Sequence, residues 1–189
     1  MTGQPFVGSM RRSLASQPVR CLAAALALLF APANATAQVD SAAPFRIPVT
    51  GFGGASYGEV IVGTSRPADV ERVLASAGGL GPKRENRVTF TIGPTELHPT
   101  ELYTPPATMN QFYFDRGVLV LVVEGIPRGL PTTRSAFLTA FPAAKETHRE
   151  SRWYELQVQV RDCLWLLAVF GATDDTLESD GYAYTCAKR

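Results

Sequence analysis

The sequence predicts an α+β fold made of two α-β-β-β repeats, each a helix packed on a three- to four-stranded antiparallel sheet. Two short segments have the apolar spacing of a helix, and they begin with similar residues, TSRPA at 64–68 and TTRSA at 132–136. Three strand-like segments follow each helix. The same order of elements occurring twice in the chain indicates a tandem repeat.

The first helix is expected from Arg66 to about Ala77. Ser65 is a suitable N-cap, Asp69 suits the positive end of the helix dipole, and Gly78 can end the helix with a positive φ. Its core-facing stripe follows the i, i+3, i+4, i+7 spacing and consists of Val70, Val73, Leu74 and Ala77.

Three strands are expected after the first helix, at 87–92, 111–114 and 118–123. A long loop with four prolines, 93–110, separates the first two. A loop of this length is often a binding element or poorly ordered. Asp115-Arg116-Gly117 suits a three-residue hairpin turn that pairs Phe114 with Val118.

The second helix is expected over Arg134–Phe141, capped by Thr133 and ended by Pro142. The strands after it are expected at 153–160, 163–170 and 182–186. An Arg161-Asp162 turn would pair Val158 with Trp165 and Leu156 with Leu167. These side chains share one face of the sheet with Tyr154, and the second helix is expected to cover that face.

The opposite face of this second sheet mixes apolar and amide side chains, which is typical of a protein-binding surface. The alternative is that this face packs on the first repeat or on a loop. The residues predicted to contact a partner are Trp153, Gln157, Gln159, Leu164, Leu166 and Phe170, with Glu155 beside them.

The first 37 residues have the features of a signal peptide. Arg11, Arg12 and Arg20 precede the apolar stretch 21–30, and Ala35-Thr36-Ala37 offers a cleavage site before Gln38. A buried N-terminal helix is the alternative. Removing residues 1–37 leaves a flexible lead-in (38–56), a first repeat (57–127) and a second repeat (128–189). The expected location is the periplasm or the extracellular space, without a membrane anchor after cleavage.

The exported part keeps two cysteines, Cys163 and Cys186. An oxidising compartment favours a disulfide between them. The antiparallel return of 182–186 along 163–170 would place the two cysteines close together. A redox or metal-binding pair is less consistent with the sequence, because no C-x-x-C motif is present.

Charge and composition exclude some functions. The chain has 18 basic and 17 acidic residues, so loss of the three signal-peptide arginines leaves 15 against 17. Without a basic run, nothing points to nucleic acid. Glu96, His98 and Glu101 lack a spacing that fixes three metal ligands on one side, so no metal or cofactor is expected.

A catalytic set is not evident either. The segment 54–58 matches G-x-S-x-G, but a strand-like segment follows Ser56 where a nucleophile elbow needs a helix. His98 lies in the proline-rich loop, and His148 lies in the charged stretch 145–152. Solvated loops explain both histidines better than general-base catalysis.

The segment Gly63-Thr64-Ser65, followed by Val70, Leu74 and Gly81-Pro82, resembles the helix opening of the outer-membrane-assembly lipoproteins of the SmpA/OmlA type. The tandem helix-and-sheet order is also similar to the β-lactamase inhibitor protein. The resemblance implies a sheet surface that binds protein, and it carries over no catalytic residue. The sequence departs from the family pattern in two features: it lacks a lipobox cysteine, and its second helix is shorter than the pattern implies.

The function expected from the sequence is therefore that of an exported, non-enzymatic binding or inhibitory module that uses a sheet face. Two alternatives remain, a small secreted hydrolase and a structural envelope-assembly protein.

Overall fold

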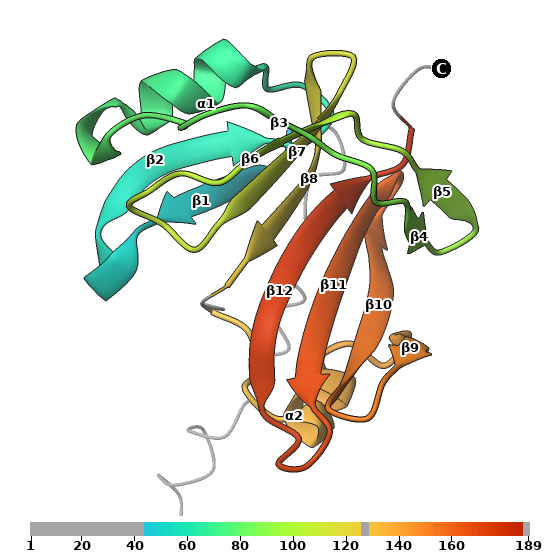
Figure 1. Ribbon diagram of the computed structural model, residues 1–189. Coiled ribbons are helices and arrows are strands. Elements are labelled where there is room, and N and C mark those ends of the chain that lie inside the picture. Colours follow the sequence, from blue (N-terminus) through green and yellow to red (C-terminus); the bar gives the residue numbers. More distant parts are fainter. Residues whose placement is uncertain (1–43, 126–128, 187–189) are drawn as a thin grey trace, which may run out of the picture. The chain divides into compact units, whose positions relative to one another are not determined.

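The structure, a computed structural model, describes residues 44–125 and 129–186. This part is an α+β unit with a large antiparallel sheet and two short α-helices (Figure 1), as predicted. The predicted signal peptide and its cleavage site lie outside the described residues. In the described part, no helix is both long and apolar enough to cross a membrane.

The helices are α1 (Pro67–Val73) and α2 (Arg134–Ala140), with short 3-10 turns at Phe52–Gly54 and Ala75–Ala77. The strands, in chain order, are β1 (Arg46–Thr50), β2 (Ser56–Ile61), β3 (Arg84–Glu85), β4 (Phe90–Ile92), β5 (Thr95–Leu97), β6 (Glu101–Tyr103), β7 (Gln111–Asp115), β8 (Val118–Glu124), β9 (Lys145–Arg149), β10 (Trp153–Arg161), β11 (Leu164–Gly171) and β12 (Leu177–Tyr184).

The main sheet has eight strands in the order β3-β6-β7-β8-β12-β11-β10-β9. The strands that follow α1 and those that follow α2 are joined at its middle, where β8 pairs antiparallel with β12. Two further pairs, β1–β2 and β4–β5, form separate small sheets. Neighbouring strands of the main sheet are neighbours in sequence except at the β8–β12 join and at β3–β6, between which the β4–β5 hairpin intervenes.

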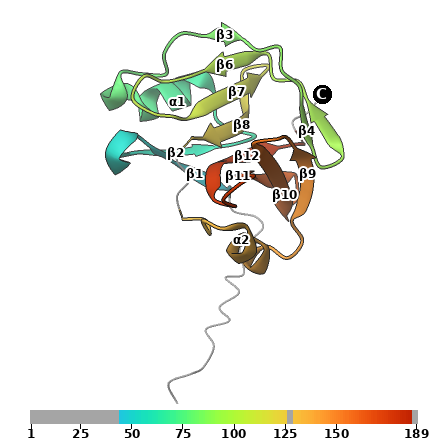
Figure 2. The same cartoon turned by 60° about the horizontal axis from the view of Figure 1, so that its bottom comes forward.

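One face of the main sheet, here called the covered face, is buried by both helices. Val70 and Leu74 of α1 pack with β1–β2 against Phe112, Phe114 and other β7–β8 residues. Phe137 of α2 packs against the β10–β11 side chains, and Tyr182 lies between the two clusters. The helices lie well apart, α1 near β2 and α2 near β10 and β11, in both Figure 1 and Figure 2.

The other face, here called the open face, is covered only at one end. The β4–β5 hairpin packs Ile92 and Leu97 against Leu121, Leu167 and neighbouring side chains of the sheet. Figure 1 shows this hairpin beside the ends of β10 and β11. The rest of the open face has no helix over it in the described part of the chain.

The helix ends follow the expected chemistry in part. Thr133 caps α2 by accepting a hydrogen bond from the Ala136 amide at 3.4 Å, as predicted. Ser65 does not cap α1, because its hydroxyl accepts from the Ile61 amide instead. Arg66 is the N-cap, and its amide donates to the Asp69 carboxylate. Both helices are shorter than the spacing predicted.

The expected three-strand repeat is wrong in its first strand. Phe90–Ile92 pairs with β5 and lies outside the main sheet, and the first strand after α1 in that sheet is the two-residue β3. The predicted loop 93–110 contains β5 and β6. The lead-in also differs from the flexible segment expected, because Arg46–Thr50 is a strand with Ile47 and Val49 fully buried.

The first hairpin turns more tightly than predicted. Asp115 pairs with Val118, which leaves Arg116 and Gly117 as a two-residue turn, both with positive φ. A bulge between Tyr113 and Phe114 leaves Val120 without a cross-strand partner and breaks the alternation along β8, so that Leu119 and Val122 both lie on the covered face. The prediction of a strand over 118–123 is confirmed as β8, which is buried along most of its length.

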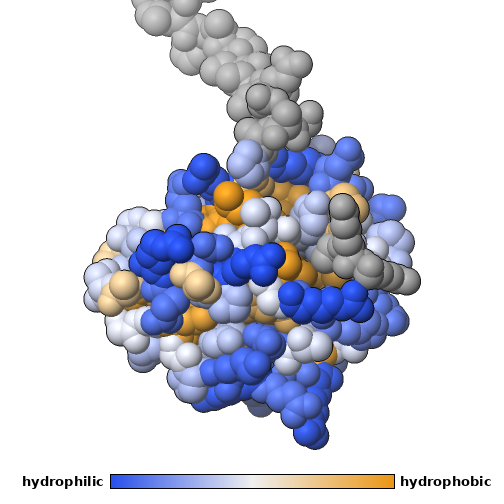
Figure 3. All heavy atoms as spheres, turned by 90° about the horizontal axis from the view of Figure 1, so that it is seen from above, coloured by the Kyte–Doolittle hydropathy of each residue, from blue (hydrophilic) through white to orange (hydrophobic). Residues whose placement is uncertain are grey.

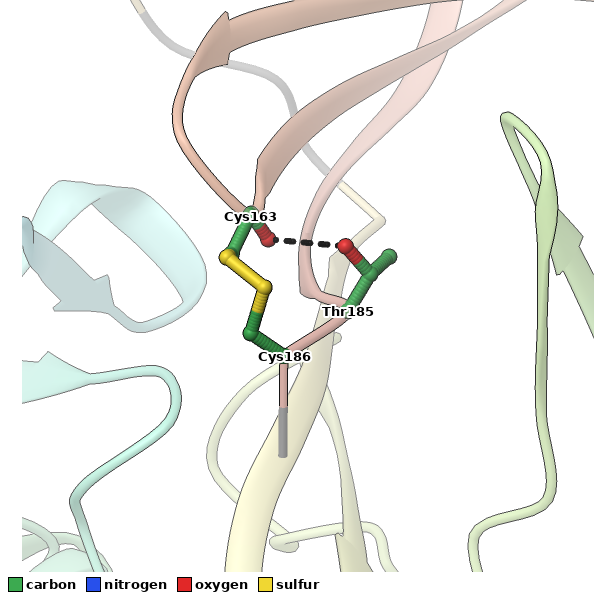
Figure 4. The surroundings of a disulfide bond; sticks show 3 residues. All are labelled: Cys163, Thr185 and Cys186. Atoms are coloured by element: carbon green, nitrogen blue, oxygen red, sulfur yellow. Dashed lines mark hydrogen bonds between the residues drawn. A yellow bond between two sulfur atoms is a disulfide. The ribbon is translucent and has the colours of Figure 1, made fainter. Parts of the chain in front are cut away.

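The predicted disulfide is present between Cys163 and Cys186 (Figure 4), with their Cα atoms 5.3 Å apart. Cys163 occupies the β10–β11 turn with a φ of 61°. Its carbonyl accepts hydrogen bonds from the Thr185 amide and hydroxyl, at 2.8 and 3.3 Å. The bond thus ties the turn to the end of β12.

Candidate functional site

The register of β10 and β11 decides which side chains share the open face. Gln157 pairs with Leu167 and Gln159 with Trp165, so the pairing is shifted by one residue from the predicted Val158–Trp165 pair. A bulge between Gln159 and Arg161 and a turn centred on Asp162-Cys163 cause the shift. A one-residue shift moves every side chain of β11 to the other face.

This shift corrects half of the predicted contact set. Leu164, Leu166 and Phe170 lie on the covered face and are at most 2% exposed, so they belong to the core under the helices. Trp153, Gln157 and Gln159 lie on the open face as predicted. The β11 residues beside them are Trp165, Leu167 and Val169. The sequence prediction placed the first two of these on the core face.

Gln157 is a buried amide that holds the β4–β5 hairpin on the sheet. Its Oε1 accepts a hydrogen bond from the Gly93 amide at 2.8 Å, and its Nε2 donates to the Thr91 carbonyl at 2.9 Å. These two bonds connect residues more than 60 positions apart in sequence. Gln157 therefore positions one wall of the open face and is not itself accessible, since its side chain is buried.

The Trp165 side chain packs directly against Gly93 in the same hairpin. A Cβ atom at Gly93 would lie 2.3 Å from the Trp165 ring, and Gly93 has a φ of 53°. Both facts require glycine at this position. The hairpin, Gln157 and Trp165 thus form one interlocked unit.

Two adjoining hollows, here together called the groove, lie on the open face next to the hairpin. Their volumes are about 640 and 130 Å³, and both are lined by Phe90, Glu155 and Leu167. The lining of the larger hollow also includes Trp153, His148 and Thr89, and that of the smaller hollow also includes Val169, Val123 and Gly181. The groove thus combines apolar side chains from four strands with a few polar groups.

Glu155 is the carboxylate of the groove. Its Oε1 accepts hydrogen bonds from Thr147 Oγ1 at 3.0 Å and from Gln157 Nε2 at 2.6 Å. These bonds fix the carboxylate between the hairpin and β9. Among the described residues, no Lys, Arg or His forms an ion pair with it.

Trp153 forms an aromatic wall at the β9 side of the groove. Its ring lies 4.9 Å from the His148 ring, centroid to centroid, and the half-buried indole borders the larger hollow. His148 Nε2 lies 3.1 Å from Glu150 Oε1. On the face seen in Figure 3, hydrophobic residues reach the surface in small patches among polar ones.

The groove gathers a histidine, a carboxylate and threonines, which raises the question of hydrolytic chemistry. Thr147 donates to Glu155, whereas His148 contacts Glu150, so no hydroxyl–histidine–carboxylate relay forms there. A partial relay begins at the edge of the groove: Thr89 Oγ1 lies 3.0 Å from His98 Nδ1, and His98 Nε2 lies 3.6 Å from Glu96.

That partial relay is poorly suited to catalysis. His98 and Glu96 are each about two-thirds exposed, so water screens the histidine–carboxylate interaction. The described residues also contain no group of three or more His, Cys, Asp or Glu side chains placed to hold a metal ion.

A second carboxylate is buried at the middle of the sheet. Asp180 lies opposite Glu124 across the β12–β8 pairing and is 2% exposed. Burial, followed by the nearby charge of Glu124, raises the pKa of Asp180 to about 7. By alternation the side chains of this pair belong to the covered face, although Asp180 also borders the smaller hollow of the groove.

In comparisons with known proteins, no family model, no curated protein and no solved structure matches this chain. The resemblance to SmpA/OmlA-type modules and to the β-lactamase inhibitor protein therefore stays an expectation drawn from the sequence. The candidate site rests on the geometry of the groove.

Proposed function

We propose that this protein is an exported, non-enzymatic binding or inhibitory module that contacts a protein partner through the groove. The observation that carries the proposal is the open face itself. Phe90, Trp153 and Val169 are half-buried there, with no element of the described chain over them. Aromatic and aliphatic side chains beside fixed polar groups are typical of interface centres.

The rigidity of the groove also supports binding. Its hairpin wall is fixed by Gln157 and Trp165, so little side-chain or loop freedom would be lost when a partner docks. The disulfide is consistent with an oxidising compartment such as the periplasm or the extracellular space.

A tandem origin of the fold belongs to the same proposal. Each helix would be the start of a repeat that contributes four consecutive sheet strands, β3, β6, β7 and β8 after α1, and β9 to β12 after α2. The sheet order supports this, because the two sets run outward from the β8–β12 pairing in the same sequence. The β4–β5 hairpin would then be an insertion specific to the first repeat.

Site-specific photocrosslinking in the native host tests the binding function. A benzoylphenylalanine at Val169, inside the groove, should give a protein adduct of discrete mass. The same group at Glu59, an exposed residue of β2, should not. Val123→Arg places a long cation in the groove from another strand and should abolish the adduct at position 169.

The folded state of each variant is checked by its melting temperature. Equal adducts at positions 169 and 59, or an adduct that survives Val123→Arg, would contradict binding through the groove.

A second candidate, a secreted hydrolase, rests on the Thr89–His98–Glu96 contacts. It predicts hydrolysis of an activated ester such as p-nitrophenyl acetate at a rate well above buffer, with loss of that rate in Thr89→Val. A wild-type rate equal to that of Thr89→Val excludes this candidate.

A further inference from the structure

We infer that the groove accepts a lysine or arginine side chain from an extended segment of its protein partner, with Glu155 as the acceptor. This inference rests on the proposed binding function and adds the chemistry of the group that is recognised.

The first argument is that Glu155 is held by hydrogen bonds but has no ion-pair partner among the described residues. Both hydrogen bonds that described residues donate to this carboxylate go to Oε1, from Thr147 and Gln157. Those bonds hold the group in place but leave its charge without a cation among the described residues. A fixed acceptor in a hollow is arranged to receive a donor from outside.

The second argument is what docking does to that charge. Any partner that covers the groove removes water from Glu155, and burying a carboxylate without a compensating charge is costly. An apolar occupant would leave the carboxylate uncompensated, and an acidic occupant would add repulsion. A basic side chain supplies both the donor and the opposite charge.

The third argument is the apolar lining. Trp153, Phe90 and Leu167 line the same hollow as the carboxylate and can contact the methylene stem of a lysine or arginine. The Trp153 ring can also receive a cation over its face. A long aliphatic stem with a charged end therefore fits the groove better than a short polar group.

Charges around the groove are compatible with a basic occupant. Beside Trp153, the His148 ring contacts the carboxylate of Glu150, an acidic group that also suits a basic occupant. Lys145 lies across from Gln157 on the exposed edge strand β9 and forms no ion pair with Glu155. The position of Glu155 thus stays open to an external cation.

The test is an NMR titration of the purified protein with two peptides of matched size, acetyl-Val-Ser-Arg-Ser-Val-amide and the same peptide with citrulline in place of arginine. Citrulline keeps the shape and most donors but has no charge. The readouts are the Trp153 indole N–H and the Val169 amide. The Trp165 indole, under the hairpin, is the internal reference, because the chain has two tryptophans.

The arginine peptide should bind at least tenfold more tightly than the citrulline peptide. Glu155→Gln should remove that preference, whereas Glu85→Gln should retain it. Glu85 is a matched control because it is an exposed carboxylate on β3, at the far edge of the sheet from β9.

Equal affinity for the two peptides, or a preference that persists in Glu155→Gln, would overturn the inference. Agmatine, a guanidinium with no peptide backbone, is the further arm. If agmatine binds as tightly as the arginine peptide, the peptide backbone adds no affinity. The groove then recognises a free small cation, and the inference of a partner segment is wrong. Crosslinking at position 169 without any arginine preference would leave the binding function standing and refute this inference alone.

Discussion

Gln157 shows how one buried polar residue can position a surface. The side-chain oxygen accepts a hydrogen bond from the Gly93 amide, and the side-chain nitrogen donates to the Thr91 carbonyl and to Glu155. Gln157 therefore links the hairpin, the sheet and the groove carboxylate. A buried amide with satisfied hydrogen bonds costs little, but its loss leaves two backbone groups without partners.

Gln157→Leu should therefore loosen the β4–β5 hairpin. We expect a loss of about 1–3 kcal/mol in the free energy of unfolding, the usual cost of unsatisfied buried groups. Amide exchange at Gly93 should become at least tenfold faster. The matched control is Gln159→Leu, an exposed amide on the same strand and face. Unchanged exchange at Gly93 in Gln157→Leu would show that the hairpin is held by apolar packing alone.

Asp180 is a residue whose burial links stability to pH. Because its pKa is raised to about 7 in the folded state, the folded protein binds a proton at this site more strongly than the unfolded chain does. Stability therefore rises as pH falls from about 8 towards 5. Glu124 and Tyr182 are the titratable neighbours that share this part of the covered face.

Asp180→Asn should remove this contribution. The wild type should gain roughly 2 kcal/mol more than the variant in the free energy of unfolding between pH 8 and pH 5, from proton linkage at a single site. Urea unfolding at the two pH values measures it. Asp162→Asn, at an exposed turn, is the control and should behave as the wild type. A wild type and an Asp180→Asn variant with the same pH dependence would refute the linkage.

At the scale of the element, β11 illustrates why a buried strand is hard to assign to a register. Its sequence LWLLAVFG is apolar on both faces, because α2 covers one face and the hairpin and groove residues occupy the other. Without alternation, either register gives a plausible core. The neighbouring β10 alternates clearly, so its two faces were predicted correctly.

Two substitutions on β11 separate the faces. Leu166→Ala removes a 1% exposed side chain from the cluster under α2 and should cost about 2–5 kcal/mol of stability. Val169→Ala removes methyl groups from the half-buried open face and should cost about 1 kcal/mol or less. Urea unfolding measures both. Similar costs at the two positions would contradict the assignment of the faces.

At the scale of the whole described unit, the sheet joins two halves through the β8–β12 pairing, and the disulfide ties the β10–β11 turn to the end of β12. Cys163 and Cys186 close a loop of 23 residues that includes the β11–β12 hairpin. The bond therefore acts on the unfolded chain by restricting a loop that contains the last two strands, β11 and β12.

Replacing both cysteines by serine should lower the free energy of unfolding by about 3 kcal/mol, the chain-entropy value for a loop of this length. Urea unfolding with and without a reductant measures the loss. The reductant should destabilise the wild type and leave the double variant unchanged. A difference below about 1 kcal/mol would mean that the unfolded chain is already restricted without the bond.

The sequence alone determined the local features of this protein, because they depend on residues close together in the chain. The positions of both helices, the Thr133 cap, the two-sided burial of 118–123 and the faces of β10 follow from spacing and cap chemistry. The disulfide was also predictable, since two cysteines near the ends of paired strands have few alternatives.

The tertiary structure decided the site. Placing Phe90–Ile92 over the open face depends on Gln157, Trp165 and Gly93, which meet across more than 60 residues. The β10–β11 bulge shifted the pairing by one residue and exchanged Leu164, Leu166 and Phe170 for Trp165, Leu167 and Val169. Packing selects among registers that have nearly equal local energies, and a single strand sequence does not contain that information.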